Sequence, residues 1–151
     1  MVNEVEHHNE RVTHPPDRER VTGVGGWLLV LCVLLLIWGP VNVGFALSTM
    51  LVGLAIRGLP LAVVMAVRLA VTALGIAAGL ALLGARSGAV FIARVALAAS
   101  ALTDLWLYTS PYVPSNRPPG DALWLVAMSL AYHATWLAYL SRSARVRNTF
   151  F

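Results

Sequence analysis

Long apolar runs fill the chain between Val21 and Leu140, and few polar positions interrupt them. This stretch holds seven charged residues: Arg57, Arg68, Arg86, Arg94, Asp104, Arg117 and Asp121. Four of them stand at breaks between the runs, whereas Arg68, Arg94 and Asp104 lie inside a run. Because a helix needs about 20 apolar residues to cross a bilayer, the pattern predicts an all-α protein, a bundle of four transmembrane helices.

The predicted spans cover about residues 27–56, 60–83, 89–109 and 121–140. Proline lacks an N–H and clashes with the preceding turn, so Gly39-Pro40 predicts a kink within the first span. In the second span, small residues recur at Ala62, Ala66, Ala70, Gly75 and Gly79. Small side chains let helix backbones approach closely, and we expect this pattern to pack within the bundle.

The first 22 residues have a different character from the rest of the chain. Their mixed charges, two prolines and lack of apolar periodicity predict a disordered cytoplasmic tail, followed by a transmembrane domain over 23–151. His7, His8 and His14 could bind a metal weakly, but the tail supplies no other fixed ligands. We therefore expect no metal site and no bound cofactor.

Composition supports a membrane location and argues against nucleic acid as a partner. The chain is 58% hydrophobic and 12% charged, whereas soluble domains have about 25% charged residues. The net charge is +4, but the arginines are divided between the tail, the turns and the C-terminus, so no basic face follows a phosphate backbone. The single cysteine, Cys32, excludes an intrachain disulfide.

The arginines also predict the orientation of the protein. With both termini in the cytoplasm, the inner side holds Arg11, Arg18, Arg20, Arg86, Arg142, Arg145 and Arg147, and the outer side holds Arg57 and Arg117. This distribution follows the positive-inside rule.

The charges inside the spans need partners, since an ionised side chain near the bilayer centre costs about 2.5–3.5 kcal/mol. Arg68 lies eight residues past Pro60, about 12 Å along its helix, and Asp104 lies five residues before Thr109, about 7–8 Å along its own. These depths predict an Arg68–Asp104 ion pair in the outer half of the bundle. The pair could fix helix register alone, or it could form part of a ligand or transport site.

Two further polar residues lie within the spans. Arg94 is five residues into the third span, where its side chain can extend to the cytoplasmic headgroups and anchor the protein. His133 lies near the middle of the fourth span. A neutral, hydrogen-bonded histidine is one interpretation, and a proton relay with Asp104 is the other.

Two terminal stretches resemble a known family. Gly25-Gly26-Trp27-Leu28-Leu29 opens the first span, and Ser141-Arg142-Ser143-Ala144-Arg145-Val146-Arg147-Asn148-Thr149-Phe150 follows Tyr139. Together they resemble the bacterial inner-membrane proteins grouped as domain of unknown function 2569, the YdgK-like family, over about residues 23–151. The resemblance implies a multi-pass protein of the bacterial inner membrane, and it implies no established activity.

The C-terminal stretch has a physical interpretation of its own. Arg142, Arg145 and Arg147 follow a helix C-terminus, where cations favour the macrodipole and anionic lipid. Phe150 can turn back into the membrane interface. We expect these residues to anchor the chain to lipid, although a partner could equally dock there.

No phosphate loop, nucleophile elbow or zinc-protease motif occurs in the sequence, so we do not expect an enzyme. The favoured function is a small structural or accessory membrane protein that associates with itself or with another membrane protein. The alternative is an oligomeric transporter or channel for a small solute or protons, built around Arg68, Asp104 and His133. That alternative requires a cavity between the spans or an oligomer.

Overall fold

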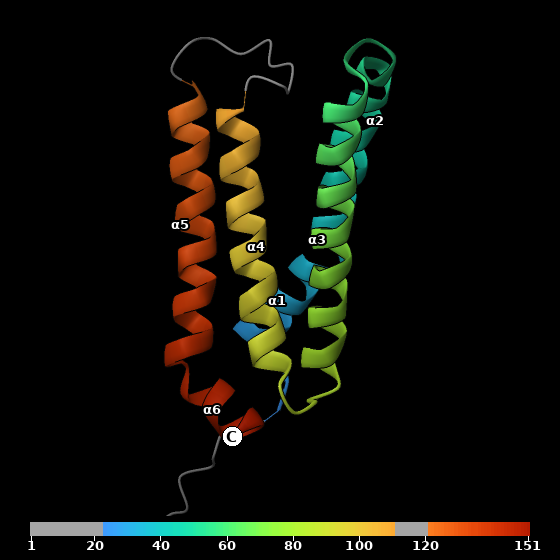
Figure 1. Cartoon of the computed structure of the whole chain (residues 1–151). Coiled ribbons are helices and arrows are strands. Elements are labelled where there is room, and N and C mark those ends of the chain that lie inside the picture. Colours follow the sequence, from blue (N-terminus) through green and yellow to red (C-terminus); the bar gives the residue numbers. More distant parts are fainter. Residues whose placement is uncertain (1–22, 111–120) are drawn as a thin grey trace, which may run out of the picture.

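The computed structural model describes residues 23–110 and 121–151, and every regular element within them is helical. The elements are α1 (Trp27–Val33), the π-helix η1 (Leu34–Trp38), α2 (Gly39–Arg57), α3 (Leu59–Leu83), α4 (Ala89–Thr109), α5 (Asp121–Arg142) and α6 (Ala144–Phe150). This all-α four-helix bundle confirms the predicted fold class (Figure 1). The predicted disordered tail, with its three histidines, lies outside the described residues.

Four helices are long and apolar enough to cross a membrane: 27–57, 59–83, 89–109 and 121–142. Their ends lie within two residues of the predicted span limits, because proline, glycine and arginine break the apolar runs at the same places. Gly58 has a φ of 59°, a left-handed value that glycine adopts without strain, and Pro60 lies in the first turn of α3. The four apolar helices indicate a membrane protein.

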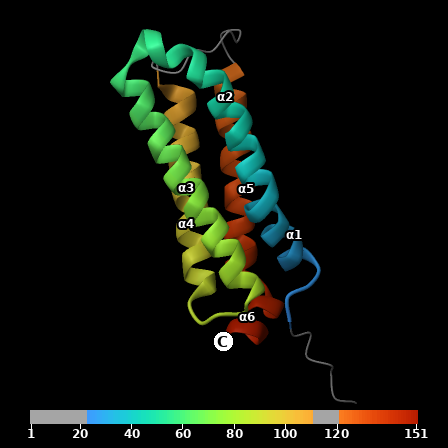
Figure 2. The same cartoon turned by 90° about the vertical axis from the view of Figure 1, so that its right-hand side faces the viewer.

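The helices pack in chain order. α2 packs on α3, α3 on α4 and α4 on α5, while α1 and η1 also pack against α3. Figure 2 shows α3 and α4 side by side, with α2 and α5 to their right. Among the described residues, α2 and α5 do not form a packed pair, so one side of the bundle is less tightly closed than the others.

The predicted irregularity at Pro40 takes the form of a π-helical turn. The Gly39 N–H bonds the Leu34 carbonyl five residues back, and the wider turn accommodates a proline that cannot donate a hydrogen bond. In Figure 1, α1 lies behind α4 in the lower half of the bundle, whereas α2 lies behind α3. The π-turn therefore lies where the first span passes from α3 towards the bundle centre.

The small residues of α3 divide between two faces. A Cβ atom at Gly79 would lie 2.8 Å from Leu36 Cγ, so this glycine permits the close contact between α3 and η1. Gly75 is likewise buried. Ala66 and Ala70 are exposed instead, so the expectation that the whole pattern packs within the bundle is wrong for these two residues. Leu35 of η1 lies beside Gly75, and Leu35 and Leu36 both lie beside Gly79.

Candidate functional site

The predicted ion pair between the second and third spans forms. Arg68 Nη1 on α3 lies 2.5 Å from Asp104 Oδ1 on α4. Both side chains are largely buried, with exposed fractions of 17% and 14%. The two residues meet because α3 and α4 are antiparallel neighbours, so positions at matched depth face each other.

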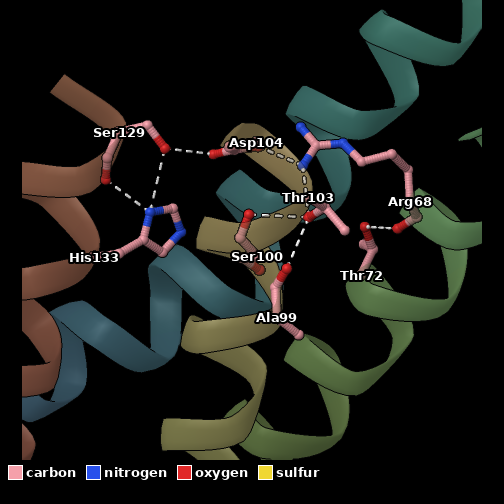
Figure 3. A network of polar contacts seen from close by, with 8 residues as sticks. All are labelled: Arg68, Thr72, Ala99, Ser100, Thr103, Asp104, Ser129 and His133. Carbon is pink, nitrogen blue, oxygen red and sulfur yellow. Dashed lines mark hydrogen bonds and ion pairs between the residues drawn. The ribbon is translucent and has the colours of Figure 1, made fainter. Parts of the chain in front are cut away.

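A third helix completes the coordination of the carboxylate. Ser129 Oγ on α5 donates a hydrogen bond of 2.7 Å to Asp104 Oδ2. Arg68 Nη1 also donates to Thr103 Oγ1 at 3.4 Å, and the Thr103 hydroxyl donates in turn to the Ala99 and Ser100 carbonyls. Figure 3 shows this chain of contacts running from α3 through α4 to α5. Both carboxylate oxygens of Asp104 therefore accept hydrogen bonds from side chains of the protein.

His133 extends the network on α5. Its Nδ1 lies 2.8 Å from the Ser129 carbonyl and 3.4 Å from Ser129 Oγ. A carbonyl can only accept, so this contact assigns a proton to Nδ1, which donates to the Ser129 carbonyl. The Tyr132 ring packs edge-on against the imidazole with a centroid distance of 5.0 Å. His133 reaches Asp104 through Ser129, rather than directly.

These residues line one cavity of about 300 Å³. Every span contributes to its wall, and Arg68, Asp104, Ser129 and His133 all face it. The π-turn forms part of the same wall through Leu34, Leu35 and Trp38. The remaining lining residues are Gly39, Asn42, Val43, Val71, Thr72, Gly75, Leu97, Ser100, Tyr108, Leu125, Met128 and Tyr132. The cavity thus combines apolar walls with a polar cluster.

The mouth of the cavity lies between the first span and α5. Trp38 is 60% exposed and Met128 is 53% exposed, although both line the cavity. Asn42 and Tyr132 are exposed lining residues on the same two elements. Since α2 and α5 do not pack together in the described part of the chain, this side opens laterally, toward the region that lipid would occupy.

The sequence did not single out Ser129 or Asn42 as site residues. Serine is common in transmembrane helices, and only the rotation of α5 shows that Ser129 faces Asp104. Asn42 is an amide in an otherwise apolar stretch, a signal that could have been noticed. Within the described ranges, the Asn42 side chain makes no hydrogen bond, and it lines the cavity.

The Arg94 side chain lies at the C-terminal end of α5. Its Nη2 donates to the Leu140 carbonyl at 3.0 Å, and its Nε is buried without a hydrogen-bond partner among the described residues. Leu140 lies in the last turn of α5, where carbonyls lack helical partners. The guanidinium therefore caps α5; contact with lipid headgroups stays a prediction.

The two stretches that carry the family resemblance contact each other. The Gly23 N–H donates to Thr149 Oγ1 at 3.1 Å, and the Arg145 guanidinium lies against Gly25, where a Cβ would be 2.9 Å from Nη1. Val146 of α6 is completely buried. The C-terminal helix thus folds under the bundle and holds the start of the first span.

This arrangement changes the interpretation of the expected lipid anchor. Phe150 is partly buried and packs against the hydrophobic core cluster of the bundle, and its entry into the membrane interface stays a prediction. Arg145 is engaged with the glycines, because α6 turns back beneath the bundle after Ser143. Arg142 and Arg147 are exposed, and their contact with anionic lipid stays a prediction.

The described residues contain no group of three or more histidine, cysteine, aspartate or glutamate side chains that could hold a metal ion. In comparisons with protein-family models, curated proteins and solved structures, nothing matches the chain. The resemblance to domain of unknown function 2569 stays a prediction.

Proposed function

We propose that this protein binds a small ligand within the membrane, in the cavity formed by its four spans. The observation that supports the proposal is that Arg68, Asp104 and His133, three polar residues from three helices, line one cavity. A pair that only fixed helix register would need no adjoining space. Ligand sites are typically cavities of about 300–1,000 Å³ with apolar walls and a few convergent polar groups.

The position of the π-turn supports the same proposal. Such turns are rare and recur at functional sites, and this one lies directly on the cavity wall. Transport would additionally require that the cavity open alternately to two sides. A binding protein that presents or carries a ligand needs only the lateral mouth, so binding is the more economical function.

A structural or accessory role is the second candidate, and one surface favours it. Ala66, Ala70, Ala73 and Ala77 are all exposed on α3 at helical spacing, which forms a shallow stripe where another helix can approach closely. A second copy or another membrane protein could occupy it. Under either function, we propose a multi-pass location in the bacterial inner membrane with both termini cytoplasmic.

Filling the cavity tests the proposed function. Gly75 lines the cavity, and a Cβ there makes ordinary contact, 3.8 Å from Leu35 Cδ2. Gly75→Leu should occupy the space without removing any polar group. Native mass spectrometry of protein extracted gently from its own membrane should show a bound small molecule in the wild type that the variant lacks.

Gly44→Leu is the matched control, because a side chain at Gly44 meets nothing within 4 Å and Gly44 does not line the cavity. It should retain the bound molecule. If Gly75→Leu retained it as well, the cavity would not be the binding site. Measuring the mass of the detergent-solubilised protein tests the second candidate: a monomer without partners would contradict it.

A further inference from the structure

The free side of the Arg68 guanidinium points to the chemical class of the ligand. A guanidinium has five N–H donors, and both hydrogen bonds that the Arg68 side chain makes use Nη1. Nη2 and Nε have no partner among the described residues, and neither is fully buried. Since Arg68 lines the cavity, these donors are open to it.

The geometry of the free donors is selective. The N–H groups of Nε and Nη2 lie in the guanidinium plane along one edge and form a fork that matches the two oxygens of a carboxylate or phosphate. In Figure 3, the dashed lines from the Arg68 guanidinium start at Nη1, and its other two nitrogens make no contact with the residues drawn. The ion pair with Asp104 thus holds the guanidinium in place and leaves one fork unused.

The other walls exclude competing ligand classes. Asp104 is the one acidic residue among the lining residues, and Arg68 and Ser129 already occupy its two oxygens. A cationic ligand would have to displace Arg68 from Asp104. A neutral apolar ligand would leave the Arg68 donors and the Asn42 amide without partners, which is costly away from water.

The mouth and the apolar walls indicate where the rest of the ligand lies. Leu34, Leu35, Leu125 and Met128 line the cavity beside the polar cluster, and the mouth between the first span and α5 faces laterally. The volume of about 300 Å³ accommodates a head group and the first carbons of a chain. A longer apolar tail would extend through the mouth into the bilayer.

We infer that the cavity binds the oxyanionic head group, carboxylate or phosphate, of a single-chain amphiphile that enters laterally from the membrane, with the Nε–Nη2 fork of Arg68 as the main contact. This inference rests on the proposed binding function and specifies its ligand.

A head-group series on one chain length tests the inference. Purified full-length protein in a non-ionic detergent is titrated with laurate, dodecyl phosphate, dodecanol and dodecyltrimethylammonium, and native mass spectrometry counts the bound molecules. Laurate or dodecyl phosphate should bind one per protein, at least about tenfold more tightly than the neutral and cationic probes, a difference set by one bidentate charged contact. Acetate and inorganic phosphate should bind far more weakly.

Lysine in place of Arg68 keeps the positive charge but removes the planar pair of N–H donors. Arg68→Lys should weaken laurate binding by about tenfold or more. Arg94→Lys, the same change at a guanidinium that does not line the cavity, should leave laurate binding unchanged. Protection of the buried Cys32 thiol from alkylation verifies that each variant is folded. If Arg68→Lys does not fold, the head-group series on the wild-type protein alone tests the inference.

The possible failures are distinguishable. If dodecanol bound as tightly as laurate and Gly75→Leu abolished both, the oxyanion inference would be overturned while the binding cavity stood. If acetate bound as tightly as laurate, the ligand would not be an amphiphile from the membrane. If no probe bound and no molecule copurified with the wild type, the proposed function would itself fail.

Discussion

Ser129 Oγ on α5 donates to the Asp104 carboxylate on α4 at 2.7 Å, which connects the ion pair of α3 and α4 to a third helix. We expect Ser129→Ala to lower the free energy of unfolding by about 1 kcal/mol, because one carboxylate oxygen loses its donor. Thermal unfolding in detergent measures the loss. Ser141→Ala is the control, since Ser141 lies on α5 but its exposed hydroxyl bonds only the Leu137 carbonyl. Equal effects of the two variants would contradict a special role for Ser129.

The ion pair predicts strong coupling between its two members. Arg68→Gln and Asp104→Asn should each destabilise the protein by about 2–4 kcal/mol, because each leaves a largely buried charge unpaired. The double variant should be milder than the sum of the two losses by at least about 1 kcal/mol. Unfolding of all three variants and the wild type in one detergent completes the cycle.

The same cycle with Arg94→Gln and Asp104→Asn provides the comparison. Arg94 bonds the Leu140 carbonyl and does not line the cavity that Asp104 faces, so its loss should add to that of Asp104. Additive losses in the Arg68 cycle would show that the ion pair contributes nothing specific.

Close contact between α3 and η1 predicts a different response at two glycines. Gly79→Ala places a methyl group 2.8 Å from Leu36 Cγ, which should cost about 1–3 kcal/mol and shift the first span. Gly44→Ala meets nothing within 4 Å and should be neutral or stabilising, since alanine favours a helix by about 1 kcal/mol over glycine. Alkylation of Cys32, which is buried in the core cluster that includes Leu31 and Ala78, should accelerate only in Gly79→Ala.

The C-terminal helix predicts a contrast between adjacent residues. Val146 is completely buried and Arg147 is exposed, so Val146→Asp should release α6 whereas Arg147→Asp should not. We expect a loss of more than about 2 kcal/mol for Val146→Asp, the cost of a buried unpaired charge. Deuterium exchange at the amides of 25–31 should increase in Val146→Asp alone, because α6 holds the start of the first span.

Deleting residues 142–151 separates the remaining roles of this segment. Loss of stability in the membrane would favour the intramolecular contacts and the lipid contacts of Arg142 and Arg147. A stable protein that lost a copurifying partner would favour docking, and would contradict the importance of the Gly23–Thr149 and Gly25–Arg145 contacts.

The sequence by itself determined the fold class, the number of long helices and the depth match of Arg68 and Asp104. Hydrophobic runs and their breaks fix the length of each helix, and the rise per residue fixes the depth of each charge, so these features need no knowledge of packing. The pair could therefore be predicted from its distance to Pro60 and to Thr109.

Only the tertiary structure decided which faces of the helices meet. The spans are apolar on all sides, so periodicity does not fix their rotation, and Ser129, Asn42 and the exposed alanines could not be assigned to a face. The position of α6 was likewise hidden, because the match between Arg145 and Gly25 joins residues at opposite ends of the chain. The cavity exists because α2 and α5 do not pack together within the described ranges, a consequence of helix arrangement that no single span encodes.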